Sequence, residues 1–267
     1  MEIIAIFGYL ASILIGVSLG LIGGGGSILT VPVLVYLFQV NPVMATAYSL
    51  FIVGATSLVG SFNSYRKGLV DIKTAVVFGI PSIAAVYGTR KWIIPAIPNE
   101  LFAVGDFLVT KSILLMLLFA VLMVAASFSM IKKGKAEEAE TGPRVFNYPL
   151  ILLEGVVVGT LTGLVGAGGG FLIIPALVVL SKLPMKMAVG TSLLIIAAKS
   201  LLGFLGDASN YEMDWTLLAS VTGLSVAGIF LGGWLNNFIS GQKLKPAFGW
   251  FVLVMGIYIL LKETLFR

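Results

Sequence analysis

Long apolar blocks separated by short polar segments run along the whole chain. They cover residues 3–22, 43–62, 72–94, 108–131, 148–165, 186–206, 214–239 and 246–263. Each block is long enough to cross a bilayer as a helix, which takes about 20 residues. Two further apolar blocks, 27–38 and 170–181, are too short to cross. The pattern predicts an all-α fold, a polytopic transmembrane helical bundle that includes broken or half-length helices.

The second half of the chain repeats the first half at an offset of 143 residues. The identical pairs include Gly23/Gly166, Pro32/Pro175 and Ser49/Ser192. Between the halves lies the strongly polar stretch "KKGKAEEAETGPR". The sequence therefore predicts a first transmembrane repeat over 1–131, a linker over 132–147 and a second transmembrane repeat over 148–267.

Equivalent loops of the two halves carry opposite charges. The basic residues Arg66, Lys67 and Lys73 surround the first-half loop, whereas its equivalent carries acidic residues such as Asp207 and Asp214. Basic loops of inner-membrane proteins face the cytoplasm, so equivalent loops are expected on opposite sides. This predicts an inverted-topology repeat, with the linker in the cytoplasm and both termini outside.

The composition excludes several classes of function. The chain is 58% hydrophobic and 11% charged, and its mean hydropathy is +1.07. It contains no cysteine or histidine, which removes disulfides, thiol nucleophiles, the usual zinc sites and histidine proton relays. We expect no enzymatic activity, no metal and no other cofactor. The net charge of +5 reflects basic loops beside the bilayer rather than nucleic-acid binding.

Two glycine-rich stretches, "GLIGGGGSILTVP" and "GLVGAGGGFLIIP", interrupt the apolar blocks at equivalent positions. Broken helices whose N-termini point at a midplane anion are typical of secondary transporters with inverted repeats. The sequence predicts two facing half-helices, the first capped by Ser27. The predicted backbone ligands are Gly23, Gly24, Gly25, Gly26, Ser27, Gly166, Gly168, Gly169 and Gly170.

Glycines at four-residue spacing have a second explanation. Gly16, Gly20 and Gly24 form such a stripe, as do the glycines at 155, 159 and 163. Small residues at this spacing allow two transmembrane helices to pack closely. We expect packing to explain these stripes, and ligand binding to explain the denser clusters.

Lys199 lies inside the 186–206 block, where a charge costs at least ~2.5 kcal/mol. It shares a helical face with Ser192, and its repeat equivalent Thr56 shares a face with Ser49. We expect these four residues, together with Thr191, to line an anion site. A structural salt bridge or a snorkelling lysine remains the alternative.

Glu154 is a second ionisable residue within an apolar block. It can couple transport to protons, pair with Lys199, or snorkel to the cytoplasmic interface. The sequence leaves these three roles open.

The two glycine motifs, with "MATAYSL" after the first and "MAVGTSL" after the second, resemble the TauE/SafE family of sulfite exporters. The resemblance spans nearly the whole chain. It implies a membrane transporter that exports a small sulfur-containing anion, such as sulfite or an organosulfonate like sulfoacetate. Together with the inverted repeat, this predicts a multi-pass inner-membrane exporter that works by alternating access between the two halves. A passive anion channel and a non-transporting accessory subunit remain the alternatives. The implied partners are the anion and the lipid bilayer, and a homo-oligomer fits the same plan.

Overall fold

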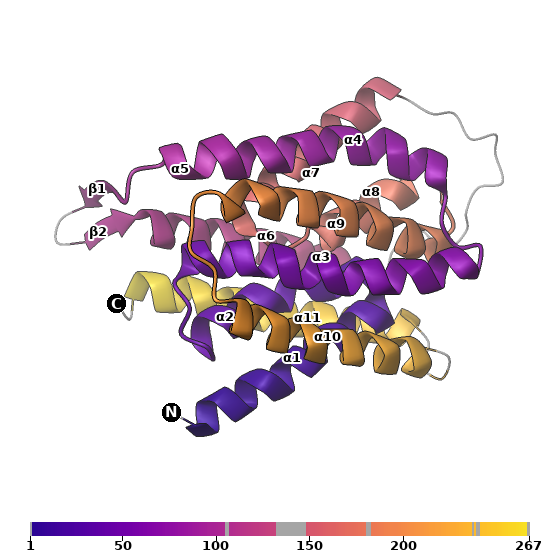
Figure 1. Ribbon diagram of the computed structural model, residues 1–267, viewed down its shortest axis with the longest axis horizontal. Helices are drawn as coiled ribbons and strands as arrows, with labels where there is room; N and C mark the ends of the chain where they lie inside the picture. Colours follow the sequence, from indigo (N-terminus) through magenta and orange to yellow (C-terminus); the bar gives the residue numbers. More distant parts are fainter. Residues whose placement is uncertain are drawn as a thin grey trace.

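The apolar blocks fold as helices, because inside a bilayer every backbone polar group has to be satisfied within its own segment. A computed structural model describes residues 2–104, 107–131, 148–179, 183–236, 238 and 241–265 (Figure 1). The predicted linker 132–147 lies outside these residues. The described part of the first half contains α1 (Glu2–Ile22), the 3₁₀ helix η1 (Gly23–Leu29), α2 (Thr30–Tyr36), α3 (Pro42–Arg66), α4 (Ile72–Gly88), the π-helical turn η2 (Thr89–Ile93), α5 (Ile94–Ala96), β1 (Glu100–Val104), β2 (Phe107–Thr110) and α6 (Lys111–Ile131). The second half contains α7 (Tyr148–Val165), α8 (Gly170–Val179), α9 (Met185–Ala208), α10 (Trp215–Leu235) and α11 (Gly241–Leu265).

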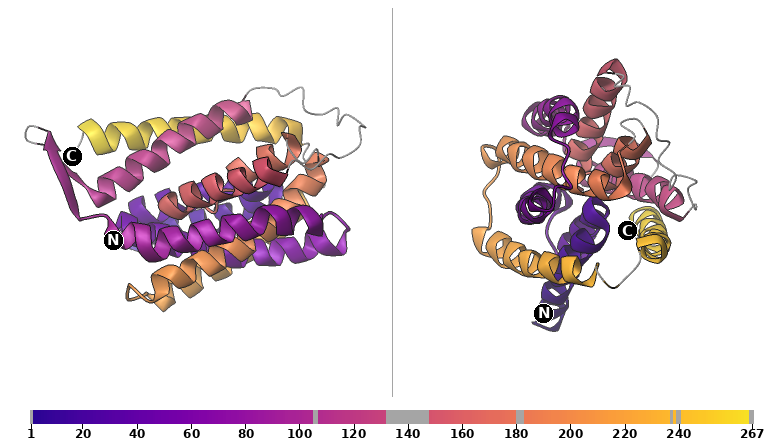
Figure 2. Two further views of the ribbon diagram at one scale, coloured as in Figure 1. Left: turned by 90° about the horizontal axis from the view of Figure 1, so that it is seen from above. Right: turned by 90° about the vertical axis from the view of Figure 1, so that its right-hand side faces the viewer.

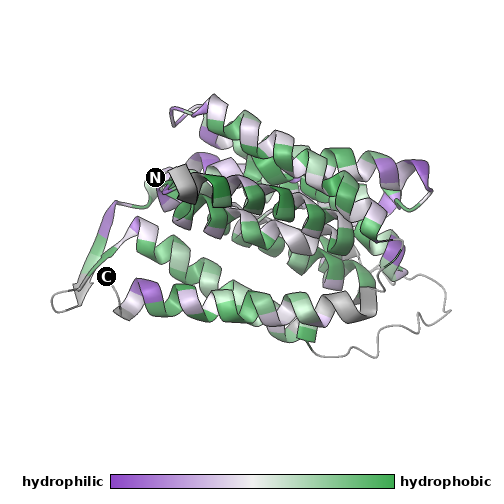
Figure 3. Ribbon diagram, turned by 90° about the horizontal axis from the view of Figure 1, so that it is seen from below, coloured by the Kyte–Doolittle hydropathy of each residue, from purple (hydrophilic) through white to green (hydrophobic). Residues whose placement is uncertain are grey.

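The described helices have the lengths and apolarity of a membrane bundle. Seven helical segments within the described residues can cross a bilayer, and the apolar part of α7, Pro149–Val165, is slightly shorter. Hydrophobic residues cover the helices, while hydrophilic residues gather toward the ends of the bundle (Figure 3). Large apolar side chains such as Phe62 and Phe230 point outward, as lipid-facing residues do. The predicted all-α polytopic fold is confirmed.

A small β-hairpin was not predicted. β1 and β2 pair antiparallel, with Phe102 opposite Val109, so the first residues of the predicted block 108–131 belong to a strand and α6 begins at Lys111. Hydropathy alone does not distinguish a short apolar strand from the start of a helix.

Two helices of the first half each pack against a helix of the second half, and the two contacts are repeat equivalents of each other. α1 packs against α10, and α7, the repeat equivalent of α1, packs against α4, the equivalent of α10. The glycine stripes form both contacts: Gly16 lies against the backbone of Ser225, and its equivalent Gly159 lies against Ser82. A Cβ at either glycine would overlap the partner helix. The prediction that these stripes serve close helix packing is confirmed except for Gly24, which lies against Gly170 at the start of α8.

The two central helices, α3 and α9, are repeat equivalents and pack against each other. Gly54 of α3 contacts Leu201, whereas Gly60, further along α3, contacts Leu193, which is earlier in α9. The two helices therefore run antiparallel. α6 and α11 form another pair at one face of the bundle, and α1 begins at the end of the bundle where α11 finishes (Figures 1 and 2).

Equivalent aspartates start α4 and α10. The carboxylates of Asp71 and Asp214 accept hydrogen bonds from the amides three residues later, at 2.8 and 3.0 Å, which is the usual N-cap arrangement. The amide of Asp71 donates to Thr191 Oγ1 at 2.9 Å, and the amide of Asp214 donates to Tyr48 Oη at 2.7 Å. Thr191 and Tyr48 are themselves repeat equivalents, so each central helix anchors the helix start of the other half.

Candidate functional site

The first glycine-rich stretch reverses the chain inside the bundle. Gly23 has a φ of 72°, which only glycine adopts readily, and it ends α1. Gly26 then lies back against α1, where a Cβ would overlap the backbone of Leu19. Ser18 Oγ also donates to the Gly26 carbonyl at 3.4 Å. The apolar run of residues 6–36 is therefore not one straight helix.

The first half-helix differs from its prediction. Residues 23–29 form a 3₁₀ helix, which continues into the short α2. Ser27 Oγ donates to the Gly24 carbonyl at 2.7 Å instead of accepting from a helix amide, so the predicted Ser27 cap is wrong. The amide of Thr30 donates to the Ser27 carbonyl, because the 3₁₀ turns already supply acceptors to the first amides of α2.

The second stretch contains three glycines in the left-handed region. Gly166, Gly168 and Gly169 have φ angles of 72°, 63° and 69°. α8 follows at Gly170, and the amides of Leu172 and Ile173 donate to the Gly169 carbonyl at 3.0 Å. The prediction of a half-length helix after this break is confirmed for Gly170–Val179, and the rest of the predicted segment 170–181 lies outside the described residues.

The two breaks meet in the interior. A Cβ at Gly170 would overlap the backbone of Gly24, and a Cβ at Gly168 would contact Ser27. All of these residues are buried. The chain brings the two predicted ligand segments together in direct contact, and the centre of the bundle is closed at this point.

Lys199 lies beside the second break. It is fully buried, and its Nζ donates to Thr162 Oγ1 at 3.0 Å. A Cβ on Gly169 would lie 2.8 Å from the same Nζ. No acidic side chain pairs with Lys199 among the described residues, which counts against the salt-bridge alternative, and the full burial of Lys199 counts against snorkelling. Its ammonium group keeps two N–H donors beyond the bond to Thr162.

A second buried cation was missed by sequence reasoning. Arg90 in η2 is fully buried, and its Nη1 lies 3.3 Å from Asp207 Oδ2 and donates to Thr46 Oγ1 at 3.0 Å. Thr46 in turn contacts Gly166 of the second break. The available signal was a pair of opposite charges within or beside the apolar blocks 72–94 and 186–206.

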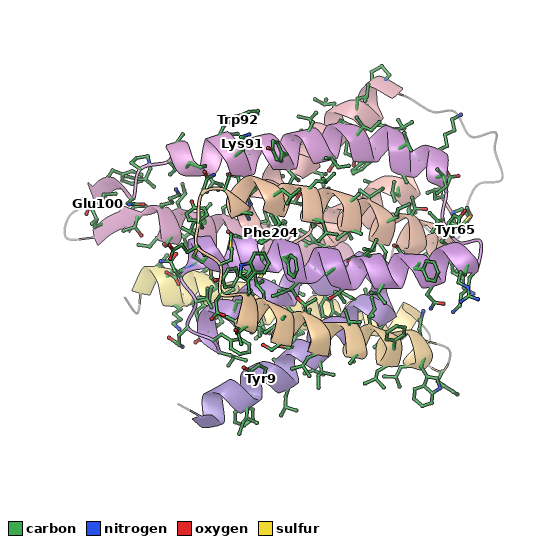
Figure 4. The ribbon with its side chains drawn as sticks, in the orientation of Figure 1. Tyr9, Tyr65, Lys91, Trp92, Glu100 and Phe204 are labelled. Carbon is green, nitrogen blue, oxygen red and sulfur yellow. The ribbon has the colours of Figure 1, made fainter. Side chains whose placement is uncertain are left out.

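Two further ionisable side chains lie near the Arg90–Asp207 pair. Lys111 at the start of α6 and Tyr211 after α9 both lie within electrostatic reach of Asp207. Partial burial and the charge of Asp207 raise the pKa of Tyr211. Next to Arg90, Lys91 and Trp92 lie at the end of the bundle away from Tyr65 (Figure 4).

A family model described as sulfite exporter TauE/SafE matches residues 8–259. The chain belongs to this family. A probable membrane transporter protein of Xylella fastidiosa strain 9a5c is 31% identical over 258 residues, covering 92% of this chain and 91% of its own length. The probable membrane transporter YdhB of Bacillus subtilis is 26% identical, over 94% of this chain and 98% of its own. A probable membrane transporter of Methanocaldococcus jannaschii is 26% identical, over 93% and 92%.

No solved structure matches this TauE/SafE chain. The family match, these relatives and the seven apolar helices make the protein a multi-pass membrane transporter.

The remaining predicted site residues of this TauE/SafE transporter fall into two groups. Ser49 and Thr56 are buried, and their hydroxyls have no hydrogen-bond partner among the described residues. Ser192 Oγ donates to the Val189 carbonyl at 2.8 Å, and Thr191 holds the start of α4. Within the described residues, the hydroxyls of Ser49 and Thr56 are thus unpaired, while those of Thr191 and Ser192 are engaged.

Glu154 is half-buried in α7. It forms no ion pair with Lys199 in the described part of the chain, so the pairing role is wrong. Proton coupling and interfacial snorkelling stay as its two roles. The described residues also hold no cluster of three acidic side chains that would suit a metal ion.

Proposed function

We propose that this transporter exports a small sulfur-containing oxyanion, sulfite or an organosulfonate such as sulfoacetate, across the inner membrane. The observation that carries the proposal is the meeting of two buried glycine-rich breaks beside the buried ammonium of Lys199. The family description as a sulfite exporter supports this class of anion.

Binding such an anion inside the bundle requires several donors at once. A hydrogen bond to a charged group contributes about 1.5–3 kcal/mol, whereas burying an unpaired charge costs far more. The ammonium of Lys199, the hydroxyls of Ser49 and Thr56, and glycine amides of the two breaks would supply such donors. The amide of Gly166 is the exception, because it donates to the Thr162 carbonyl at 2.9 Å. Lys199 also supplies the full positive charge that offsets the charge of the anion.

The two halves would act as an inverted-topology repeat that alternates access to this centre. The antiparallel packing of the equivalent helices α3 and α9, and the exchanged contacts α1–α10 and α7–α4, support the inversion. The contact of Gly24 with Gly170 would then be the occluded state, and substrate would enter when η1 and α8 separate.

The two alternatives predict different behaviour. A passive channel would carry the anion at high rates that no ion gradient accelerates. An accessory subunit would keep the breaks in contact and carry no anion. The relatives, all described as probable membrane transporters, favour transport.

The test is anion flux into proteoliposomes. Wild-type protein should carry radiolabelled sulfite or sulfoacetate, and Lys199→Met should reduce the rate at least about tenfold, because the anion loses its one central charge. Lys186→Met is the matched control, since Lys186 is exposed on the same helix. Flux at the level of empty liposomes for both anions, or unchanged flux in Lys199→Met, would overturn the proposal.

A further inference from the structure

Arg90 is a buried guanidinium that keeps one of its edges unpaired. Its Nη1 is taken by Thr46 and Asp207, whereas Nε and Nη2 have no hydrogen-bond partner among the described residues. Both oxygens of Asp207 also lack a hydrogen bond there, although Oδ2 lies within ion-pair distance. The pair is therefore held together by charge, with hydrogen-bonding capacity left over on both sides.

An ion pair that is buried in this way is not expected to increase the stability of the fold. Desolvating an ion pair is repaid only when the remaining donors and acceptors are satisfied, and a well-packed apolar pair is often as stable. A buried donor without a partner costs about 1–3 kcal/mol. Two such donors on one fully buried side chain point to a ligand that pairs with them in another state of the transporter.

The free edge has the shape that an oxyanion requires. The Nε–H and Nη2–H of a guanidinium are parallel donors that match two oxygens of a carboxylate, phosphate or similar group. Sulfite and sulfonate groups present oxygen pairs of the same kind. We propose that Arg90 forms a second oxyanion-binding station, in which its Nε–Nη2 edge binds two oxygens of the transported anion. This inference rests on the proposed function.

The position of Arg90 places this station next to the central one. Thr46, which accepts from Arg90, contacts Gly166 at the start of the second break, while Lys199 lies against Gly169 at its end. Both buried cations thus flank the same break. An anion that leaves Lys199 would reach Arg90 by moving along this break toward the end of the bundle where α3 begins.

A π-helical turn carries the residue itself. η2 interrupts the end of α4 over Thr89–Ile93, and single π turns within α-helices occur frequently at functional sites. Within this turn Arg90 is buried, whereas Trp92 is exposed.

Asp207 would pair with Arg90 in the absence of the anion, and its negative charge would oppose anion binding. Its carboxylate neutralises Arg90 when no anion is present, and Lys111 and Tyr211 are the other ionisable groups that act on it. An anion on the free edge of Arg90 places a second negative charge near Asp207. Removing the charge of Asp207 should therefore strengthen anion binding.

The deciding variant is the double change Arg90→Gln with Asp207→Asn. It removes both charges together, so no uncompensated charge is left buried and the protein should fold. The dissociation constant for radiolabelled sulfite, measured on detergent-purified protein, should rise about ten- to hundredfold, as expected for the loss of one charge-assisted bidentate contact. Lys91→Gln is the control, because Lys91 carries the neighbouring charge but contacts Tyr87.

The single variant Asp207→Asn provides a test of opposite sign. It should bind sulfite more tightly than the wild type, whereas a purely structural ion pair predicts weaker or unchanged binding. Wild-type affinity in the double variant would overturn the Arg90 station, and weaker or unchanged binding in Asp207→Asn would overturn the competing role of Asp207. Sulfite binding without flux would overturn only the proposed transport function, and no binding of sulfite or sulfoacetate to the wild type would overturn both.

Discussion

The contact between the two glycine breaks gives a sharp prediction for Gly170→Ala. Gly170 has no left-handed φ, so alanine fits its backbone, and the added methyl group acts only through its neighbours. The three atoms nearest to that methyl group all belong to the backbone of Gly24. A backbone cannot move aside by changing a rotamer, so η1 and α8 would have to separate.

The cost follows from the kind of clash. Overpacking a well-packed interior costs about 1–3 kcal/mol, and the rigidity of the backbone neighbour places this case at the upper end. Alanine gains roughly 1 kcal/mol over glycine in a helix, which leaves a net loss of about 2 kcal/mol. For a chain of this size such a loss lowers the melting temperature by about 4–8 °C.

The assay compares Gly170→Ala with Gly223→Ala in detergent-purified protein and in proteoliposomes. Gly223 lies in α10, and no atom comes within 4 Å of an added Cβ, so this control adds the same methyl group into open space. We expect a lower melting temperature and slower anion flux only for Gly170→Ala, because only this change opposes the closed state. If both variants match the wild type in stability and flux, the breaks do not need to touch.

Three further predictions test the repeat, the coupling and the orientation. Tyr48→Phe removes the acceptor of the Asp214 amide, and should reduce the free energy of unfolding by about 1 kcal/mol; an unchanged melting curve would count against that anchor. If Glu154 couples transport to protons, Glu154→Gln should abolish the acceleration of flux by an imposed proton gradient, while equal acceleration in the variant would assign Glu154 to the interface. Because the chain has no cysteine, Ala136→Cys in the linker can be labelled selectively, and a membrane-impermeant thiol reagent should reach it only after the cells are opened. Labelling in intact cells would contradict the predicted cytoplasmic linker.

Most of the fold could be predicted because two signals extend over the whole chain, the hydropathy of the apolar blocks and the sequence repeat. The lengths of the apolar blocks set the helices, and the offset of 143 residues identifies α3 with α9 and α4 with α10. Equivalent residues then make equivalent contacts, as Gly16 and Gly159 show against Ser225 and Ser82. A duplicated sequence thus specifies its packing twice.

Local conformation was harder to predict. Four consecutive glycines permit a loop, a 3₁₀ helix or a half-helix start almost equally. In the structure they form 3₁₀ turns, with Gly26 lying against α1. The residues of the short β-hairpin carry no pattern that hydropathy distinguishes from a helix.

Part of the candidate site was also beyond the sequence. The charges of Arg90 and Asp207 are visible in the chain, but their residues are 117 positions apart and not repeat equivalents. Only the packing of the end of α4 against the end of α9 brings them together. Lys199 was easier, because a lysine in the middle of an apolar block already predicts a buried cation.

The duplicated halves are alike in packing and unlike in charge. At the repeat offset Lys199 corresponds to Thr56, and Arg90 corresponds to Gly233, so neither cation has a charged equivalent in the other half. Under the proposed mechanism, the equivalent packing lets the halves exchange conformations at little cost in free energy. The unequal charge would hold the anion beside the second break in both conformations, because Lys199 and Arg90 flank that break and have no charged equivalents in the other half. Opening would then change which side of the membrane the bound anion faces, without first having to transfer it from one half to the other.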